Sequence, residues 1–384
     1  MKKIYTAIFA AILCIGASAQ QPYTIPRETM ARMFPAGVVS PEINADGSVT
    51  FRCQAPNAQK VELNCQMLDR NAPMVKDEAG VWSVTVKPKS PDIYPYCFVV
   101  DGTQIADPNN PDIFPNEGFK NSLVDVRGAV PSMQDLQDVP HGKVSYRYYT
   151  SKRLGFDRPM CVYTPPGYNP AESTKYPVLY LIHGMTDTYE TWFKVGKMNN
   201  ILDNLIAQGQ AEPMIVVMPY ANPYPEMILR GLAQAYDAMN TEIVVREIID
   251  EVMPYIEANY KVQSDADHRA VAGFSLGGRQ ALATGIGNPD KFHYVCAFAP
   301  AIFNGEWNSN FDNGTYAAPE AINSNLKLLW VSCGIDDGLV TASRGLDASF
   351  NEKNIRHQAY FCQGAHTWMN CRDWLELTSK MLFK

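Results

Sequence analysis

From residue 144 onward, short apolar runs alternate with longer amphipathic stretches, and this alternation restricts the fold of the chain more than any other feature. Strands that alternate with helices pair in parallel, and the helices then cover both faces of the sheet. The pattern therefore predicts an α/β domain with a mostly parallel sheet over residues 144–384. Strands are expected at 160–163, 178–182, 214–218, 270–273, 294–298, 328–331 and 358–361, and helices at 199–208, 241–259, 278–287 and 343–353.

The preceding part of the chain has a different pattern. Residues 20–127 contain short stretches in which apolar and polar side chains alternate, separated by turn signals such as Asp-Gly and Ala-Gly. Short alternating strands at this spacing predict an all-β sandwich. Residues 128–143 combine Pro131, Pro140 and Gly142 with polar neighbours, so we expect this segment to be a linker.

The first 19 residues match a signal peptide. Lys2 and Lys3 precede an apolar stretch at 4–16, and Ala-Ser-Ala at 17–19 is a cleavage site that would leave Gln20 first. The apolar stretch is too short for a comfortable membrane span, which argues against an anchor, and no later segment is long and apolar enough to cross a bilayer. We therefore expect an exported protein, located in the periplasm or outside the cell.

The charge of the chain excludes some partners. Loss of Lys2 and Lys3 changes the formal charge from −7 to −9. Like-charge repulsion then disfavours nucleic acid and anionic membranes, whereas a neutral or esterified substrate fits. The sequence has no Cys-x-x-Cys pair, His-Glu-x-x-His motif or phosphate-binding loop, so we predict neither a metal nor another cofactor.

A Gly-x-Ser-x-Gly motif at 273–277 follows the strand-like run 269–272 and opens a helix. This context is typical of a nucleophile elbow, a tight turn that needs small residues on both sides of the serine. The turn would place Ser275 at the carboxyl edge of the sheet and at a helix N-terminus, whose dipole favours a developing oxyanion. We predict that Ser275 is a catalytic nucleophile.

A serine hydroxyl is a weak nucleophile and needs a base. In a fold with this elbow the histidine follows the serine along the chain, which leaves His293, His357 and His366. His293 and His357 lie where strands begin. His366 lies in a glycine-containing loop after a strand, where active sites of such sheets are found, so we predict that His366 is the base.

The acid of the triad is expected in the loop after the strand at 328–331. Asp336 and Asp337 both lie there, and either carboxylate could orient the imidazole through its Nδ1–H. The oxyanion hole is expected to use the backbone N–H of Leu276, directly after the nucleophile, and that of Met185, in the loop after the strand at 178–182. Gly184 lets the backbone approach there, and the neighbouring histidine, His183, is expected to make a structural hydrogen bond.

Taken together, these residues resemble the feruloyl esterase and esterase D group, carbohydrate esterase family one. The resemblance spans about residues 144–384 and implies hydrolysis of carboxylic esters on plant cell-wall polysaccharides, chiefly feruloyl and acetyl groups on xylan, without metal or organic cofactor. It also places the acid three residues after Gly334, which selects Asp337. The chain departs from the pattern at Ala365 and Cys371. The matching strings lie at 163–168, 181–185, 273–278, 288–292, 333–337 and 364–368.

The N-terminal region resembles the immunoglobulin-like module related to the carbohydrate-binding domains of glycogen-branching enzymes. The matching strings lie at 51–56, 80–86, 98–102 and 107–111. Modules of this group are often structural, so the resemblance does not imply sugar binding. We expect residues 20–127 to support or extend the substrate cleft.

Several aromatic residues lie near the predicted site. Trp192, Trp307, Trp368 and Tyr189 could stack on a planar acyl group, although each fits the core equally well. We predict a serine ester hydrolase that releases hydroxycinnamates, with acetyl as a second substrate. The alternatives are a siderophore or thioester hydrolase, an envelope acyltransferase with the same triad, and a carbohydrate-binding protein with a relic hydrolase domain.

Overall fold

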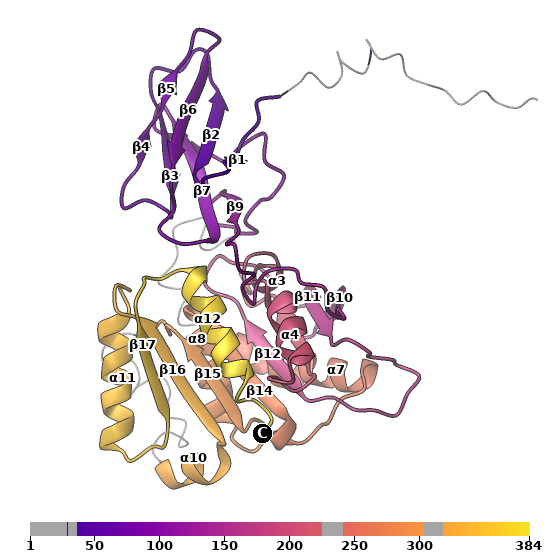
Figure 1. Cartoon of the computed structure of the whole chain (residues 1–384). Coiled ribbons are helices and arrows are strands. Elements are labelled where there is room, and N and C mark those ends of the chain that lie inside the picture. The colour runs from indigo at the N-terminus through magenta and orange to yellow at the C-terminus, as the bar shows by residue number, and fades with distance from the viewer. Residues whose placement is uncertain (1–28, 30–36, 225–240, 303–317) are drawn as a thin grey trace, which may run out of the picture.

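The computed structural model describes residue 29 and residues 37–224, 241–302 and 318–384 (Figure 1). The predicted signal peptide and Trp307 lie outside the described residues. A β-sandwich stands on an α/β domain whose sheet is mostly parallel, so the predicted fold class is confirmed. No helix among the described residues is long and apolar enough to span a membrane.

The sandwich consists of two antiparallel sheets. Alternating side chains of β2 and β3 are buried between the sheets, as expected for strands with one face on a core. Phe51 of one sheet packs edge to face on Tyr96 of the other, with ring centroids 4.6 Å apart. One sheet contains β1 (Glu42–Ile43), β2 (Val49–Gln54), β6 (Val81–Val86) and β5 (Val75–Lys76), and the other β4 (Ala72–Pro73), β3 (Val61–Cys65), β7 (Asp92–Val100), β8 (Thr103–Ile105) and β9 (Ser122–Val126).

The α/β domain is built on an eight-stranded sheet. The first three strands along the sheet pair antiparallel, and all the others pair parallel. β12, β13 and β15 are buried along their whole length, because helices cover both faces there. The order is β10 (Lys143–Ser151), β11 (Phe156–Thr164), β13 (Ile215–Pro219), β12 (Val178–Ile182), β14 (Arg269–Phe274), β15 (Tyr294–Phe298), β16 (Leu328–Gly334) and β17 (Gln358–Cys362).

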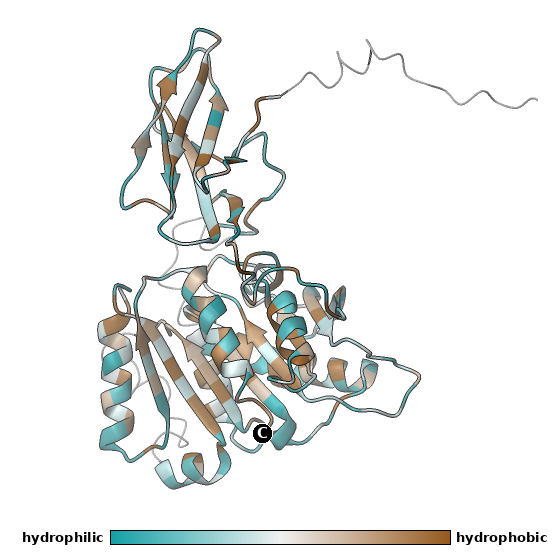
Figure 2. Cartoon of the chain, viewed as in Figure 1, coloured by the Kyte–Doolittle hydropathy of each residue, from teal (hydrophilic) through white to brown (hydrophobic). Residues whose placement is uncertain are grey.

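Two apolar cores lie on opposite faces of this sheet. Alternate residues of β12 point to opposite faces, so Tyr180 joins the core under one set of helices and Leu181 the core under the other. One face carries α7 (Met253–Asn259), α8 (Leu276–Gly287), α10 (Pro319–Asn325) and α11 (Val340–Glu352), and the other carries α3 (Thr191–Lys194), α4 (Met198–Ala207) and α12 (Trp368–Ser379). Figure 2 shows hydrophobic residues along the central strands and hydrophilic residues over much of α11.

The stretch predicted as one helix, 241–259, is divided. Residues 241–247 are α-helical, a π-helical turn follows at Ile248–Val252, and α7 begins at Met253. Pro254 has no N–H to donate and cannot continue the regular hydrogen-bond ladder, which accounts for a change of helical type directly before it.

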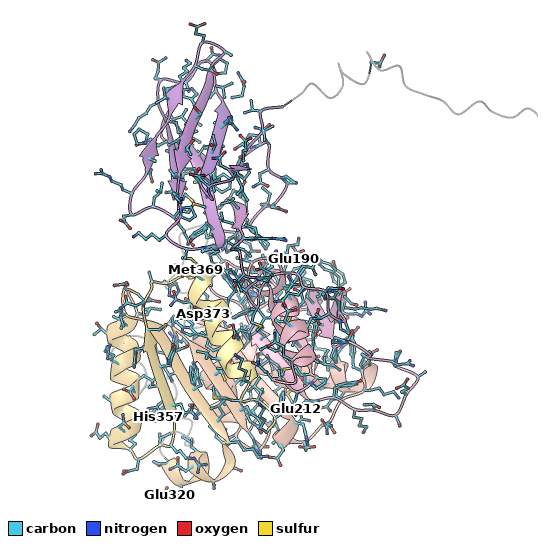
Figure 3. The ribbon with its side chains drawn as sticks, in the orientation of Figure 1. Glu190, Glu212, Glu320, His357, Met369 and Asp373 are labelled. Atoms are coloured by element: carbon cyan, nitrogen blue, oxygen red, sulfur yellow. The ribbon has the colours of Figure 1, made fainter. Side chains whose placement is uncertain are left out.

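The sandwich is attached to the α/β domain along its connecting segment and through α12. Amide groups of Asn200 and Asn204 on α4 donate to the carbonyls of residues 133–135, at 2.8 to 3.0 Å. Arg372 of α12 pairs with Asp92 of β7. Met369, labelled at the end of α12 in Figure 3, packs against the core of the sandwich. The predicted linker is thus bound to the domain surface.

Candidate active site

The turn between β14 and α8 holds the candidate nucleophile in an uncommon backbone conformation. Ser275 has φ 58° and ψ −118°. Its N–H donates to the Phe298 carbonyl at 2.8 Å, and its carbonyl accepts the N–H of Ala301 at 2.9 Å. These bonds to the end of β15 and to the segment after it hold the strained turn, as expected for a residue at a functional site.

The glycines of the motif are required by close backbone packing. A Cβ at Gly277 would overlap with the carbonyl oxygens of Ile182 and His183, and a Cβ at Gly273 would overlap with the backbone of Gly277. The first turn of α8 therefore lies directly against the end of β12. This contact brings Ser275 next to the loop that follows β12.

The candidate base and acid are joined by a hydrogen bond. His366 Nδ1 donates to Asp337 Oδ2 at 2.7 Å, and Asp337 is only 3% exposed. The other carboxylate oxygen of Asp337 accepts the N–H of Leu339 at 2.8 Å, which fixes the carboxylate. The imidazole also stacks on Phe274, with ring centroids 4.4 Å apart.

The neighbouring acid has a different environment. Asp336 is exposed, and its carboxylate accepts a long 3.4 Å bond from the N–H of Gly364. Its own N–H donates to the Gly364 carbonyl at 3.0 Å. Asp336 thus joins two loops, whereas Asp337 is hydrogen-bonded to His366.

Ser275 and His366 line one hollow of about 170 Å³. Gly184, Met185 and Asp187 from the loop after β12 lie in its wall, together with Phe274 and Trp368. The β-sandwich provides the rest of the wall: Gln66, Pro95, Phe114, Asn116, Phe119 and Asn121. The module was expected to support or extend the cleft, but none of these six residues was predicted, because no local pattern shows which of its loops reach the site.

The candidate oxyanion donors come from two segments, the turn after β14 and the loop after β12. Leu276 is the first residue of α8, so its N–H has no acceptor within the helix. Met185 lines the hollow from the opposite loop and is half exposed. The next residue, Thr186, has a positive φ of 65°, so the loop makes a sharp turn beside Ser275.

The four aromatic residues proposed for substrate contact have different positions. Trp368 lines the hollow, and its ring packs edge to face on Phe274 and on Trp192. Trp192 does not line the hollow: it is 1% exposed and donates its Nε1–H to the Ile182 carbonyl. The expected contact of Trp192 with substrate is therefore replaced by a supporting position behind Trp368. Tyr189 packs on Tyr146 and Tyr220, and Trp307 lies outside the described residues.

His183 makes structural hydrogen bonds with both ring nitrogens. The N–H of Ala221 donates to Nε2 at 2.9 Å, so Nδ1 carries the proton and donates to the Gly184 carbonyl at 2.8 Å. Burial lowers the pKa of His183 to about 4, with a smaller contribution from the charge of Arg158. A neutral imidazole with both nitrogens engaged does not act as a base, and here it holds the loop after β12.

Asp187 is a buried carboxyl group beside the nucleophile. Burial raises its pKa to about 7, against the opposite effect of hydrogen bonds from Asn116 and the Gly184 backbone. The raised pKa means that the folded state favours the protonated, neutral form of Asp187. The stabilisation that this gives the folded protein is complete below the ordinary pKa of 3.8 and is lost as the pH rises through about 7. The other titratable groups of this region are Glu117, Lys120, His183, His366 and Cys371.

Asp187→Asn should therefore change how stability depends on pH. The amide keeps the shape but does not titrate, so the free energy of unfolding of the variant relative to the native protein should increase between pH 5 and pH 8. Urea unfolding of both proteins at pH 5 and at pH 8 measures this difference in free energy, with the exposed Asp69→Asn as control. A relative stability of Asp187→Asn that is the same at both values would contradict the prediction.

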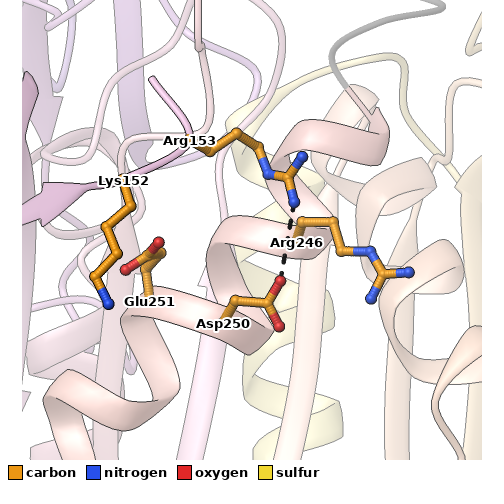
Figure 4. A pocket seen from close by; sticks show the side chains of 5 residues that line it. All are labelled: Lys152, Arg153, Arg246, Asp250 and Glu251. Atoms are coloured by element: carbon orange, nitrogen blue, oxygen red, sulfur yellow. Dashed lines mark ion pairs between the residues drawn. The ribbon is translucent and has the colours of Figure 1, made fainter. Parts of the chain in front are cut away.

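A second hollow lies on the β10–β11 side of the domain. Lys152, Arg153, Arg246, Asp250 and Glu251 line it, and Arg153 pairs with Asp250 at 4.0 Å (Figure 4). Among the residues that the structure describes, its lining is charged and contains no hydroxyl or imidazole group. It is therefore not a candidate for ester hydrolysis.

The comparison with protein families agrees with this geometry. Residues 151–374, more than half of the chain, match the esterase family described as "Putative esterase". The chain belongs to this esterase family. Residues 37–111 match carbohydrate-binding module 48, the isoamylase N-terminal domain, so the resemblances stated for both parts of the sequence are confirmed.

Curated relatives of this esterase include enzymes of xylan breakdown. An endo-1,4-beta-xylanase/feruloyl esterase of Xylanibacter ruminicola is 29% identical over 357 residues, which cover 90% of this chain and 46% of that protein. The S-formylglutathione hydrolase of Rattus norvegicus is 29% identical over 168 residues, 40% of this chain and 55% of that enzyme. The chain thus spans about half the length of these relatives.

Solved structures show the same fold. A CE1 ferulic acid esterase from Anaeromyces mucronatus superimposes with a TM-score of 0.55 and 24% identity, covering 66% of this chain and 96% of that chain. An enterobactin esterase from Shigella flexneri superimposes with a TM-score of 0.64 and 18% identity, covering 87% of this chain and 93% of that chain. At these identities the likeness establishes the fold of the esterase and not its substrate.

Proposed function

We propose that this chain is an exported serine carboxylic-ester hydrolase that releases feruloyl or acetyl groups from arabinoxylan through an acyl-enzyme. The observation that supports this most is the shared hollow of Ser275 and His366, with Asp337 bonded to the far side of the imidazole. A nucleophile, a base and an orienting acid in this order are the elements of a serine hydrolase.

In this mechanism Ser275 Oγ attacks the carbonyl carbon of the ester, and His366 Nε2 takes the hydroxyl proton. The N–H groups of Met185 and Leu276 stabilise the negative charge on the carbonyl oxygen. The C–O bond to the sugar then breaks, and His366 gives its proton to the departing sugar oxygen. Water, activated by the same imidazole, hydrolyses the acyl-enzyme and frees the acid and Ser275.

The wall of the hollow supports an aromatic acyl group. Phe114, Phe119 and Trp368 line it, and Phe119 packs edge to face on Phe114 with centroids 5.1 Å apart. A planar hydroxycinnamoyl ring can stack on such a surface, whereas an acetyl group leaves it unused. The xylanase/feruloyl esterase relative, which aligns over 90% of this chain, also favours this substrate class.

The substrate class can be tested with methyl ferulate and acetylated xylan in parallel. We expect release of ferulate, with acetate as a second product. Phe119→Ala should lower kcat/KM for methyl ferulate by roughly 2- to 10-fold, the value of one aromatic contact, and leave hydrolysis of p-nitrophenyl acetate unchanged. If acetylated xylan is cleaved while methyl ferulate is untouched, the feruloyl part of the proposal is wrong.

A siderophore ester is the second candidate. The enterobactin esterase superimposes on 87% of this chain, more than the 66% covered by the ferulic acid esterase, so its likeness extends over the β-sandwich as well. Enterobactin hydrolysis, assayed beside methyl ferulate, separates the two candidates. Activity on enterobactin alone would favour the second.

A further inference from the structure

A segment of the β-sandwich is bonded to the loop that follows β12. Between β8 and β9 the chain passes over this loop, where Asn116 and Asp187 form an isolated antiparallel bridge. The N–H of Glu117 donates to the Thr186 carbonyl at 2.7 Å. The hydroxyl of Thr191 donates to the Pro115 carbonyl at 2.9 Å. Consecutive residues of the module are thus tied to the loop that carries Met185 and to the helix that follows it.

The side chain of Asn116 is held in one orientation. Its Oδ1 accepts the N–H groups of Gly118 and Phe119, at 2.8 and 3.1 Å, so its Nδ2 points to Asp187 Oδ1 at 2.9 Å. Both Asn116 and Asp187 are 5% exposed, so water does not compete for this bond. Asp187 in turn bonds to the backbone of Gly184, on the other side of Met185.

Glu117 connects the same loop to the end of β13. Its carboxylate accepts hydrogen bonds from the Tyr220 hydroxyl and, at 3.3 Å, from the Asn222 amide. The amide of Asn222 also donates to the Asp187 carbonyl at 2.8 Å. On the module side, Gly118 leaves room for the side chain of Thr186, since a Cβ at 118 would be 2.9 Å from Thr186 Cγ2.

We propose that Asn116 and Glu117 are positioning residues for catalysis, which hold the loop at 184–187 so that the Met185 N–H points at the oxyanion. The inference rests on the proposed serine mechanism. An oxyanion donor works only within about 2.7 to 3.1 Å of the developing charge, so a small shift of this loop lowers the rate. The module is then a part of the catalytic unit in addition to any role in substrate binding.

Three variants of the full chain test this. Asn116→Ala removes the donor to Asp187. Asn116→Asp places two carboxyl groups against each other. The double variant Asn116→Asp with Asp187→Asn, called the exchange variant, restores the bond with donor and acceptor interchanged. In the exchange, the carboxylate introduced at position 116 can still accept the N–H groups of Gly118 and Phe119. Asn109→Ala, an exposed asparagine of the same connection, is the matched control.

The readout is kcat and KM for p-nitrophenyl acetate, together with the melting temperature. We expect kcat to fall about 10- to 100-fold in Asn116→Ala and at least as much in Asn116→Asp, with KM within about twofold, because the bond acts through an oxyanion donor. The exchange variant should recover kcat to within about threefold of the native enzyme, and Asn109→Ala should keep it.

Two results would overturn the proposal: a native kcat in Asn116→Ala, or an exchange variant that is no more active than Asn116→Asp. The exchange keeps the test decisive even if Asn116→Ala is poorly folded. Absence of hydrolysis in the native protein would instead reject the proposed function, so the two failures are distinguishable.

Discussion

Ser275→Ala and His366→Ala are each expected to lower kcat on p-nitrophenyl acetate by about 10⁴- to 10⁶-fold, because triad members act as a unit and loss of one removes covalent catalysis. In Ser275→Ala no oxygen remains to form the acyl-enzyme. In His366→Ala the hydroxyl stays but has no base to take its proton. The double variant should be little worse than either single variant, since the effects are not additive.

Neither change should disturb the fold. Alanine keeps the Cβ of Ser275, so the strain of the turn at φ 58° is unchanged, and the backbone bonds to Phe298 and Ala301 do not involve the hydroxyl. His366 is partly exposed, and its loss removes one stacking contact with Phe274 and the hydrogen bond to Asp337, whose other oxygen keeps the N–H of Leu339. The melting temperature should therefore stay close to that of the native enzyme.

A matched control is available in the same domain. His268 pairs with Asp265 at 2.7 Å, as His366 does with Asp337, but it precedes β14, at the opposite end of the strand from Ser275. His268→Ala should keep the native rate. Native-like turnover in Ser275→Ala or His366→Ala would refute the assignment of the nucleophile or base.

Asp337→Asn is expected to lower kcat by about 10⁴-fold, the loss seen when an asparagine replaces the triad acid of a serine protease. The amide keeps the size of the carboxylate, but it offers an N–H to His366 Nδ1. It therefore favours the tautomer in which Nδ1 has no proton and Nε2 carries it. Nε2, the atom that takes the Ser275 proton in the proposed mechanism, then already carries a proton and cannot accept another. Because Asp337 is buried, a water molecule cannot readily take over the role of its carboxylate as the acceptor for His366 Nδ1–H.

Asp336→Asn is the internal control for this prediction. Asp336 is exposed and bonds to the backbone of Gly364, which an asparagine Oδ1 can also accept, so kcat should fall by less than about threefold. Both variants are compared on one ester over a range of pH. Equal losses, or a larger loss in Asp336→Asn, would show that the acid is the wrong neighbour.

Much of the site could be predicted from the sequence because its signals are local. Gly273 and Gly277 lie at backbone contacts that leave no room for a Cβ. This requirement fixes glycines at constant spacing around Ser275, so the sequence alone reveals it. The alternation of strands and helices places the loops that hold Asp337 and His366 at one sheet edge, since the carboxyl ends of parallel strands meet there. The parallel sheet from β12 to β17 has this arrangement.

The tertiary structure decided what depends on contacts between distant segments. The sequence alone left each aromatic equally suited to core or site; packing puts Trp192 behind Trp368 and leaves Trp368 in the wall. Asp336 and Asp337 are adjacent and identical in type; the family resemblance selects Asp337, but only the structure shows which carboxylate bonds to His366. The contribution of Asn116 and Phe119 arises because the β-sandwich lies over the loop after β12. No periodicity or motif records that contact, since the docking of two domains depends on the shapes of surfaces formed only after each has folded.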